Sequence, residues 1–340
     1  MDLTSAMRRA NELSQLGLGM SAPNPIVGAV IIDRDGQLVG EGFHHRENGG
    51  KHAEVAALEN AGERAKGSTL VLTLEPCNHQ GKTPACTEAI IKQGIAKVVF
   101  AVSDSNPIAM GGAQRLIAAG IEVESGLLHE EVAFTNRAWL TKIEKSRPYI
   151  TLKVAATLDG KVAAADGSSK WITGESARAD VHRLRSECDA ILTGTGTVLA
   201  DDPSMTVRGA DRQNFKFSPV RVVMGKSSIP AGSKILDSAA TTIHLESNNL
   251  SQLLELAVEK GWNRILVEAG PRLTSAFIRT GLFDEIFLYQ APTLLGGNFD
   301  FTNGIDVRNI SERIDLRINS VEVIGDDQKD LRLHLLAVKK

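Results

Sequence analysis

One histidine and two cysteines in the first third of the chain could bind a metal ion together: His52, Cys77 and Cys86. One imidazole and two thiolates suit a catalytic zinc ion, which keeps its fourth coordination position for water. Glu54 lies two residues after His52 and fits a general acid/base better than a ligand. These residue types therefore predict a zinc ion that activates water beside a carboxylate that moves protons.

The order His-x-Glu followed by Pro-Cys and a second Cys is the signature of zinc deaminases. The spacing departs from it, because eight residues separate Cys77 from Cys86 where the usual signature has two. Taken alone, His-x-Glu is most often a solvated helix face and Pro-Cys a buried thiol. A purely structural zinc site would need a fourth protein ligand, for which His79 is the candidate. That alternative would leave Glu54 without a role.

The elements that must position these residues alternate between strand and helix. The pattern of apolar residues predicts that His52 begins a helix and that a short apolar strand delivers Cys77. Pro84 suits the first position of a helix, so Cys86 is expected in the first turn of another helix. Both helix N-termini would favour thiolate over thiol. Expected helices span 2–16, 52–60, 84–93, 114–119 and 129–146, and expected strands span 26–32, 38–43, 69–74, 97–102 and 121–123.

A chain of 340 residues is long for one hydrophobic core, so two domains are expected. We place the boundary before Arg147-Pro148, giving domains 1–146 and 147–340. The second half also alternates, which predicts an α/β sheet in both domains. Its expected strands are 149–157, 190–194, 220–224, 241–245, 264–268 and 284–290, its expected helices are 176–186, 251–260 and 272–280, and residues 313–338 are expected to form a β-hairpin.

Composition limits the possible partners. The net charge is −3 and no block of Lys and Arg occurs, which argues against a nucleic-acid partner. No apolar stretch approaches the length of a membrane span, and the N-terminus does not resemble a secretory signal. Three cysteines without an export signal predict reduced thiols and a cytoplasmic location. Cys188 matches no motif and is expected to be an ordinary buried or partly buried thiol.

In the second half, a glycine turn and a helix start at Gly270 could bind phosphate through free backbone amides. Gly194 and Gly196 form a Gly-x-Gly pattern, but Leu199 stands where a Rossmann fingerprint has its third glycine. From these residues alone, a dinucleotide site is a weak prediction, and two tight turns in an α/β domain are the simpler interpretation.

Longer motifs resemble the bifunctional deaminase/reductase family of bacterial riboflavin biosynthesis. In the first half these are HAEV at 52–55 and LEPCNHQGKTPAC at 74–86, whose long gap between cysteines is typical of that family. In the second half they are KVAATLDGK at 153–161, SKWIT at 169–173, LADDP at 199–203 and VEAGP at 267–271. The resemblance implies an N-terminal cytidine-deaminase-like three-layer α/β/α domain and a C-terminal dihydrofolate-reductase-like α/β domain.

The reactions implied by the resemblance are zinc-dependent hydrolytic deamination of 2,5-diamino-6-(5-phosphoribosylamino)pyrimidin-4(3H)-one, followed by NADPH-dependent reduction of the ribosyl to the ribityl side chain. His52, Cys77 and Cys86 would hold Zn2+, and Glu54 would shuttle the proton. The substrate is a small phosphorylated pyrimidine, and the family suggests a homodimer or larger oligomer.

The family's ligand contacts carry over residue by residue onto this sequence. The deaminase substrate would meet Asn24, His44, Lys82, Asp104 and Asn106. The nicotinamide cofactor would meet Ala155, Trp171, Thr197, Asp201, Ser227 and the turn Gly270, Pro271, Arg272, Leu273, Thr274, Ser275 and Ala276. The reductase substrate would meet Lys153, Ser169, Arg185, Met205, Arg208 and Glu268.

Two segments depart from the family pattern. Met110-Gly111-Gly112-Ala113 replaces a usual Ala-Gly-x-Gly, and Gly225-Lys226-Ser227 follows Met224 where the family tends to have Asp-Ser. Ser227 could supply the missing hydroxyl, and Lys226 could meet an adenosine 2′-phosphate.

Two other functions remain possible from the sequence. One is a nucleic-acid base deaminase with a non-catalytic C-terminal domain. The other is a non-catalytic, zinc-stapled module that binds a nucleotide.

Overall fold

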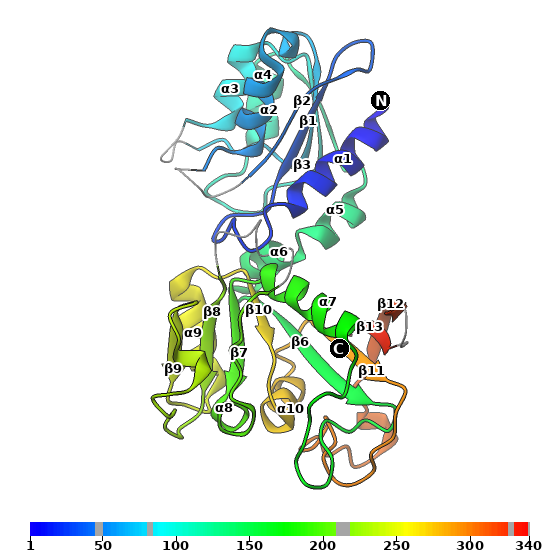
Figure 1. The fold of residues 1–340 in the computed structure, drawn as a ribbon. Helices are drawn as coiled ribbons and strands as arrows, with labels where there is room; N and C mark the ends of the chain where they lie inside the picture. The colour runs from blue at the N-terminus through cyan, green and yellow to red at the C-terminus, as the bar shows by residue number, and fades with distance from the viewer. Residues whose placement is uncertain (45–49, 80–83, 209–217, 326–329, 339–340) are drawn as a thin grey trace. The chain divides into compact units, whose positions relative to one another are not determined.

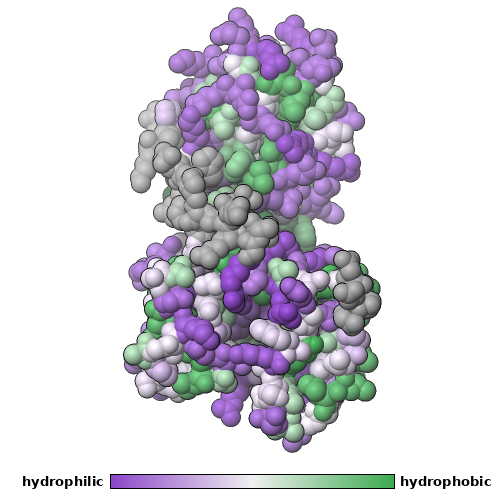
Figure 2. Space-filling model, in the orientation of Figure 1, coloured by the Kyte–Doolittle hydropathy of each residue, from purple (hydrophilic) through white to green (hydrophobic). Residues whose placement is uncertain are grey.

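The computed structural model describes residues 1–44, 50–79, 84–208, 218–325 and 330–338. The chain divides into two compact units, Met1–Arg147 and Pro148–Lys340 (Figure 1). On the face drawn in Figure 2, hydrophilic side chains predominate and apolar ones form small patches. No helix in the described ranges is both long enough and apolar enough to cross a membrane.

The first unit has a five-stranded sheet of order β2-β1-β3-β4-β5. Strand β1 runs antiparallel to β2 and β3, and β3, β4 and β5 are parallel. The strands are β1 Gly28–Ile32, β2 Leu38–Phe43, β3 Thr69–Leu74, β4 Lys97–Val102 and β5 Glu122–Ser125. The sequences of β1, β3 and β4 are apolar runs because these strands are buried on both faces.

Helices cover both faces of this sheet, which confirms the predicted three-layer α/β/α arrangement. Helices α1 and α5 lie on one face, and α2, α3 and α4 lie on the other (Figure 1). The bounds are α1 Leu3–Gln15, α2 Ala53–Ala61, α3 Cys86–Gln93, α4 Gly112–Ala118, α5 His129–Thr135 and α6 Arg137–Lys145, with a short 3-10 helix η2 at Gly62–Ala65.

The single helix predicted for 129–146 is wrong, because α5 and α6 are separate helices. The break falls at Asn136, whose φ of −93° and ψ of 15° are not helical. Asn is a weak helix former that favours helix ends, which accounts for the break at this residue.

Small residues bring α2 close to strand β2. A Cβ atom at Gly40 would lie 2.4 Å from the carbonyl oxygen of Ala57, and one at Gly42 would lie 2.7 Å from that of Ala53. Side chains at these two positions would therefore push α2 off the sheet. Because α2 follows directly on His52 and carries Glu54, this close approach helps to set the place of both functional side chains.

The second unit has an eight-stranded sheet of order β12-β13-β11-β6-β10-β7-β8-β9. Strand β13 is antiparallel to both its neighbours, and the other pairs are parallel. The strands are β6 Tyr149–Thr157, β7 Ala190–Gly194, β8 Val220–Met224, β9 Thr242–Leu245, β10 Arg264–Val267, β11 Glu285–Ala291, β12 Leu316–Ile324 and β13 Asp330–Ala337. The hairpin predicted for the tail is confirmed as β12 and β13.

Separate apolar clusters pack on the two faces of this sheet. The helices are α7 Glu175–Ser186, α8 Thr195–Asp201, α9 Leu250–Lys260 and α10 Pro271–Thr280, with 3-10 helices η4 at Lys234–Leu236 and η5 at Ile310–Glu312. Strand β10 lies between β6 and β7, so the direction of strand order reverses there. In α/β sheets such a switch point is where ligands bind, beyond the carboxyl ends of the strands.

Candidate functional sites

Three ligands for one metal ion meet at the carboxyl end of β3. His52 is the N-cap of α2, Cys77 follows β3, and Cys86 is the first residue of α3. Their ligand atoms all lie within 4.8 Å of one another. His52 Nδ1 lies 3.1 Å from Cys86 Sγ and 3.7 Å from Cys77 Sγ. A tetrahedral zinc ion with ordinary bond lengths separates N and S ligands by about 3.6 Å, so the residues fit zinc.

His79 is not part of this group, so the described residues offer three ligands rather than four. Three protein ligands are typical of a catalytic zinc site. The backbone N–H of Cys86 donates a hydrogen bond to Cys77 Sγ at 3.5 Å. The neighbouring Cys86 thiol and the His52 ring lower the pKa of Cys77 to about 4. The closeness of Cys77 and burial raise the pKa of Cys86. The second thiol would release its proton on binding a metal ion.

Glu54 stands beside the ligands but outside the ligand group. It is the second residue of α2 and only 4% exposed. Burial raises the pKa of its carboxyl group, and the nearby His52 partly offsets this. A carboxyl group with a raised pKa holds its proton more readily than an ordinary one, which suits a general acid/base.

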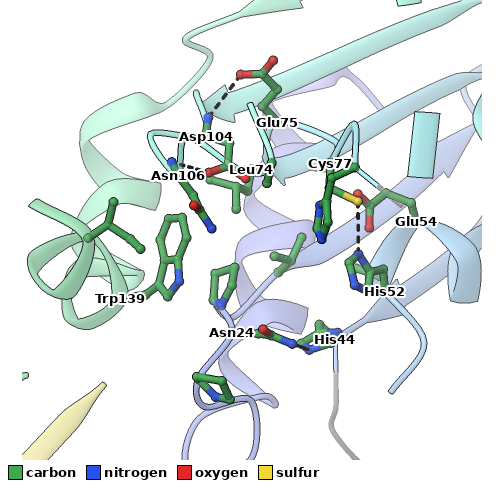
Figure 3. A pocket seen from close by; sticks show the side chains of 17 residues that line it. Asn24, His44, His52, Glu54, Leu74, Glu75, Cys77, Asp104, Asn106 and Trp139 are labelled. Atoms are coloured by element: carbon green, nitrogen blue, oxygen red, sulfur yellow. Dashed lines mark hydrogen bonds between the residues drawn. The ribbon is translucent and has the colours of Figure 1, made fainter. Parts of the chain in front are cut away.

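A cavity of about 280 Å³ brings His52, Glu54 and Cys77 together with four of the predicted substrate contacts (Figure 3). Asn24 Nδ2 lies 3.2 Å from His44 Nε2, and Asp104 Oδ1 accepts a hydrogen bond from the backbone of Asn106 at 2.8 Å. Burial raises the pKa of Asp104. The fifth predicted contact, Lys82, lies outside the described residues.

The cavity is also lined by residues for which the sequence predicted no substrate contact, among them Glu75, His79, Trp139 and Ile143. Glu75 is buried, and its carboxylate accepts hydrogen bonds from the backbone of Asp104 at 3.1 Å and of Ala113 at 2.9 Å. It therefore ties the metal-ligand strand to the loop of Asp104 and to α4. Glu75 and His79 belong to the motif at 74–86. Trp139 and Ile143 come from α6 and carry no local signal.

The second unit has a larger cavity of about 1380 Å³, here called the reductase cleft. It exceeds the roughly 300–1,000 Å³ of a typical single-ligand site, which leaves room for a cofactor and a substrate. Every predicted contact in this unit except Ser275 lines it. Ser275 is fully buried and donates a hydrogen bond to the carbonyl of Asn303 at 2.9 Å.

A buried ion cluster lies in the reductase cleft. Arg185 makes two hydrogen bonds to Glu268, at 2.5 and 3.0 Å, and the Lys153 ammonium lies 3.5 Å from the same carboxylate. Burial alone would raise the pKa of Glu268, but the charges of Arg185 and Lys153 lower it to about 2. Two cations around one carboxylate leave a net positive charge that suits an anionic ligand.

The N-terminus of α10 opens on the same cleft. Gly270 is its N-cap and Pro271 its first residue, and the backbone N–H of Gly270 donates to Thr197 Oγ1 at 3.2 Å. Amides at such a helix start suit the phosphates of a dinucleotide. Ser227 lines the cleft and Lys226 does not. Cys188 is buried, as predicted, and donates to the carbonyl of Leu184.

The fold and the two sites define a zinc-binding deaminase unit joined in one chain to a reductase unit. Comparison with known families agrees. Residues 2–102 match the cytidine and deoxycytidylate deaminase zinc-binding region, and residues 148–329 match the RibD C-terminal domain.

Whole-chain relatives identify the family. The riboflavin biosynthesis protein RibD of Mycobacterium tuberculosis is 45% identical over 96% of this chain and 95% of its own length. The RibD protein of Aquifex aeolicus is 41% identical over 94% of this chain and 95% of its own length. Two solved structures cover 99% of both chains with a TM-score of 0.90: Acinetobacter baumannii RibD, 40% identical, and a deaminase/reductase from Thermotoga maritima, 34% identical. The chain belongs to the RibD family of riboflavin biosynthesis proteins and is a bifunctional enzyme with deaminase and reductase units.

Proposed function

We propose that the deaminase unit converts 2,5-diamino-6-(5-phosphoribosylamino)pyrimidin-4(3H)-one to 5-amino-6-(5-phosphoribosylamino)uracil, and that the reductase unit reduces the ribosyl group of this product with NADPH. The observation that carries the proposal is the joint presence of a three-ligand zinc site beside buried Glu54 and a cationic cleft at a sheet switch point. The Thermotoga relative supports the substrates, because its name states both activities.

In the deaminase unit, His52, Cys77 and Cys86 hold the zinc ion. Zinc, when bound, supplies Lewis-acid activation of water. A Glu54 carboxylate oxygen takes a proton from the attacking water and returns it to the departing amino group. Asn24, His44, Asp104 and Asn106 offer donors and acceptors to the polar edges of the substrate.

In the reductase unit, the α10 N-terminus and Ala155, Trp171, Thr197, Asp201 and Ser227 hold NADPH, which supplies the hydride. The substrate lies against Lys153, Ser169, Arg185, Met205, Arg208 and Glu268. Arg185 already pairs with Glu268. The Arg208 side chain forms no ion pair or hydrogen bond among the described residues, so it is the better anchor for the substrate phosphate.

The test follows ammonia and NADPH separately during anaerobic incubation with the diaminopyrimidine phosphate. Ammonia should appear without NADPH, and NADPH oxidation should begin only after ammonia has formed. Zinc-loaded protein that releases no ammonia would favour the zinc-stapled binding module instead. Salt-sensitive binding of RNA, together with deamination of its bases, would favour a nucleic-acid deaminase.

We also propose that the protein is a homo-oligomer located in the cytoplasm. Strand β12 is the edge of its sheet, and Ile318, Val321 and Val323 on it are 63%, 52% and 67% exposed. An apolar edge strand readily pairs with another chain. Light scattering should give at least twice the mass of one chain, and Val323→Lys should lower that mass. The cytoplasmic location rests on the three free cysteines.

A further inference from the structure

One face of helix α7 is directed at the reductase cleft. Arg178, His182 and Arg185 are four and three residues apart in sequence, so they share this face. Arg178 and Arg185 line the cleft. His182 is half-buried between them and belongs to none of the motifs found in the sequence.

His182 contacts the backbone of the segment that carries Arg208. The backbone N–H of Arg208 donates a hydrogen bond to His182 Nδ1 at 3.1 Å. Two residues earlier, the carbonyl of Thr206 accepts a hydrogen bond from Arg185 at 2.9 Å. Helix α7 therefore holds this irregular segment at two backbone points.

The contact fixes the state of the imidazole ring. Because Nδ1 accepts a hydrogen bond, the proton of the neutral ring lies on Nε2. Burial and the charges of Arg185 and Arg208 lower the pKa of His182, which favours this neutral form, while the Glu268 charge and the Thr206 backbone oppose them. A second proton on Nδ1 would break the contact with Arg208.

We propose that His182 is a positioning residue of the reductase site, which holds the Arg208 backbone so that the guanidinium faces the substrate phosphate. The inference rests on the proposed function, in which Arg208 binds that phosphate. The Arg208 side chain lines the cleft and is exposed, without a hydrogen bond or ion pair to the rest of the described chain. Its position therefore depends on how its backbone is held.

Three variants of His182 test the role. His182→Ala removes the acceptor and should raise the reductase KM for the deaminated phosphate substrate about five- to tenfold. The kcat and the Kd for NADPH should change less, by under about twofold. His182→Asn places an oxygen near the position of Nδ1 and should restore most of the affinity. His182→Gln places its oxygen further out and should behave like His182→Ala.

The matched control is His129→Ala in the deaminase unit. The His129 ring also bonds to backbone, with Nδ1 3.1 Å from the carbonyl oxygen of Ala101. This variant should leave the reductase KM unchanged. In an Arg208→Ala background, His182→Ala should add no further rise in KM, because its effect passes through Arg208.

The outcomes separate the inference from the function on which it rests. An unchanged KM in Arg208→Ala would overturn the phosphate-binding role itself. A raised KM in Arg208→Ala together with a normal KM in His182→Gln would overturn the positioning role of His182 alone. Additive effects in the double variant, or an equal loss of NADPH affinity, would also overturn it.

Discussion

At the scale of single residues, the deaminase site separates the binding of metal from the movement of protons. His52, Cys77 and Cys86 have ligand atoms that converge, whereas Glu54 is buried beside them with a raised pKa. A carboxylate used as a fourth ligand would lose the capacity to take a proton. The two roles can therefore be tested with one substitution.

Glu54→Gln should keep zinc and lose deamination by roughly 10²–10⁴-fold, the usual contribution of a general acid/base. The amide has nearly the same shape as the carboxyl group but cannot exchange the proton. Metal analysis and ammonia release measure the two properties. NADPH oxidation with deaminated substrate serves as the control and should persist. Loss of zinc from the variant would show that Glu54 is a ligand.

The pH dependence of stability should report the Glu268 ion cluster. Its folded-state pKa of about 2 lies below the ordinary 4.5, so the stabilisation is present above pH 4.5 and is lost as the pH falls toward 2. The shift corresponds to at most about 3 kcal/mol. Urea unfolding at pH 6 and pH 3 should show a smaller pH effect in Glu268→Gln than in wild type. Exposed Glu255→Gln is the control and should match wild type; equal pH effects in Glu268→Gln and wild type would refute the assignment.

The residues that could be predicted from the sequence are those whose chemistry is local. His52, Glu54 and Cys77 were found because side-chain type and spacing specify a metal site. Trp139 was not, because its place in the cavity wall depends on how α6 packs, and no short motif encodes that. Glu75 lies within the motif at 74–86, but its hydrogen bonds reach residues far along the chain.

At the scale of elements, the place of Glu54 depends on the contact between α2 and β2. The alanines of α2 meet Gly40 and Gly42, so the helix lies closer to the sheet than larger side chains would allow. The helix and the strand were both predicted from the sequence. The close approach of the helix to the strand was not predicted, because glycine in a strand indicates a bulge as readily as a packing contact.

Gly42→Ala should lower the zinc content and the deaminase rate while leaving the reductase active. Its Cβ would lie 2.7 Å from the carbonyl oxygen of Ala53, so α2 must shift. Ala53 stands between His52 and Glu54 in the sequence, so the shift would move both. Overpacking of this kind costs roughly 1–3 kcal/mol. Zinc per chain after dialysis and the melting temperature measure the effect. Gly232→Ala is the control, because nothing lies within 4 Å of its added Cβ. Full zinc retention in Gly42→Ala would show that this contact does not position the ligands.

The prediction of a single helix over 129–146 was wrong because the local sequence signal was again ambiguous. Apolar periodicity continues from α5 into α6, and a weak helix former at Asn136 is not enough to predict a break. Buried strands were easier to predict, because an apolar run such as that of β3 has few alternatives.

At the scale of the whole molecule, each unit has its own cavity, lined by described residues of that unit. The zinc ligands and their cavity fall within the first unit, and the reductase cleft is lined from Lys153 to Asn303 in the second. Each unit also has its own apolar core. Neither site borrows a residue from the other among those described.

We therefore expect the chain to work when it is divided after Arg147. A protein of residues 1–147 should melt cooperatively, bind one zinc ion and release ammonia from the diaminopyrimidine phosphate, because its core and its ligands are its own. A protein of residues 148–340 should bind NADPH and reduce deaminated substrate. Calorimetry, metal analysis and NADPH oxidation measure these properties, with the undivided chain as the control. If neither half melts cooperatively, the two units share a core and the boundary is wrong. If both fold and only the mixture is active, a residue of one unit completes the site of the other.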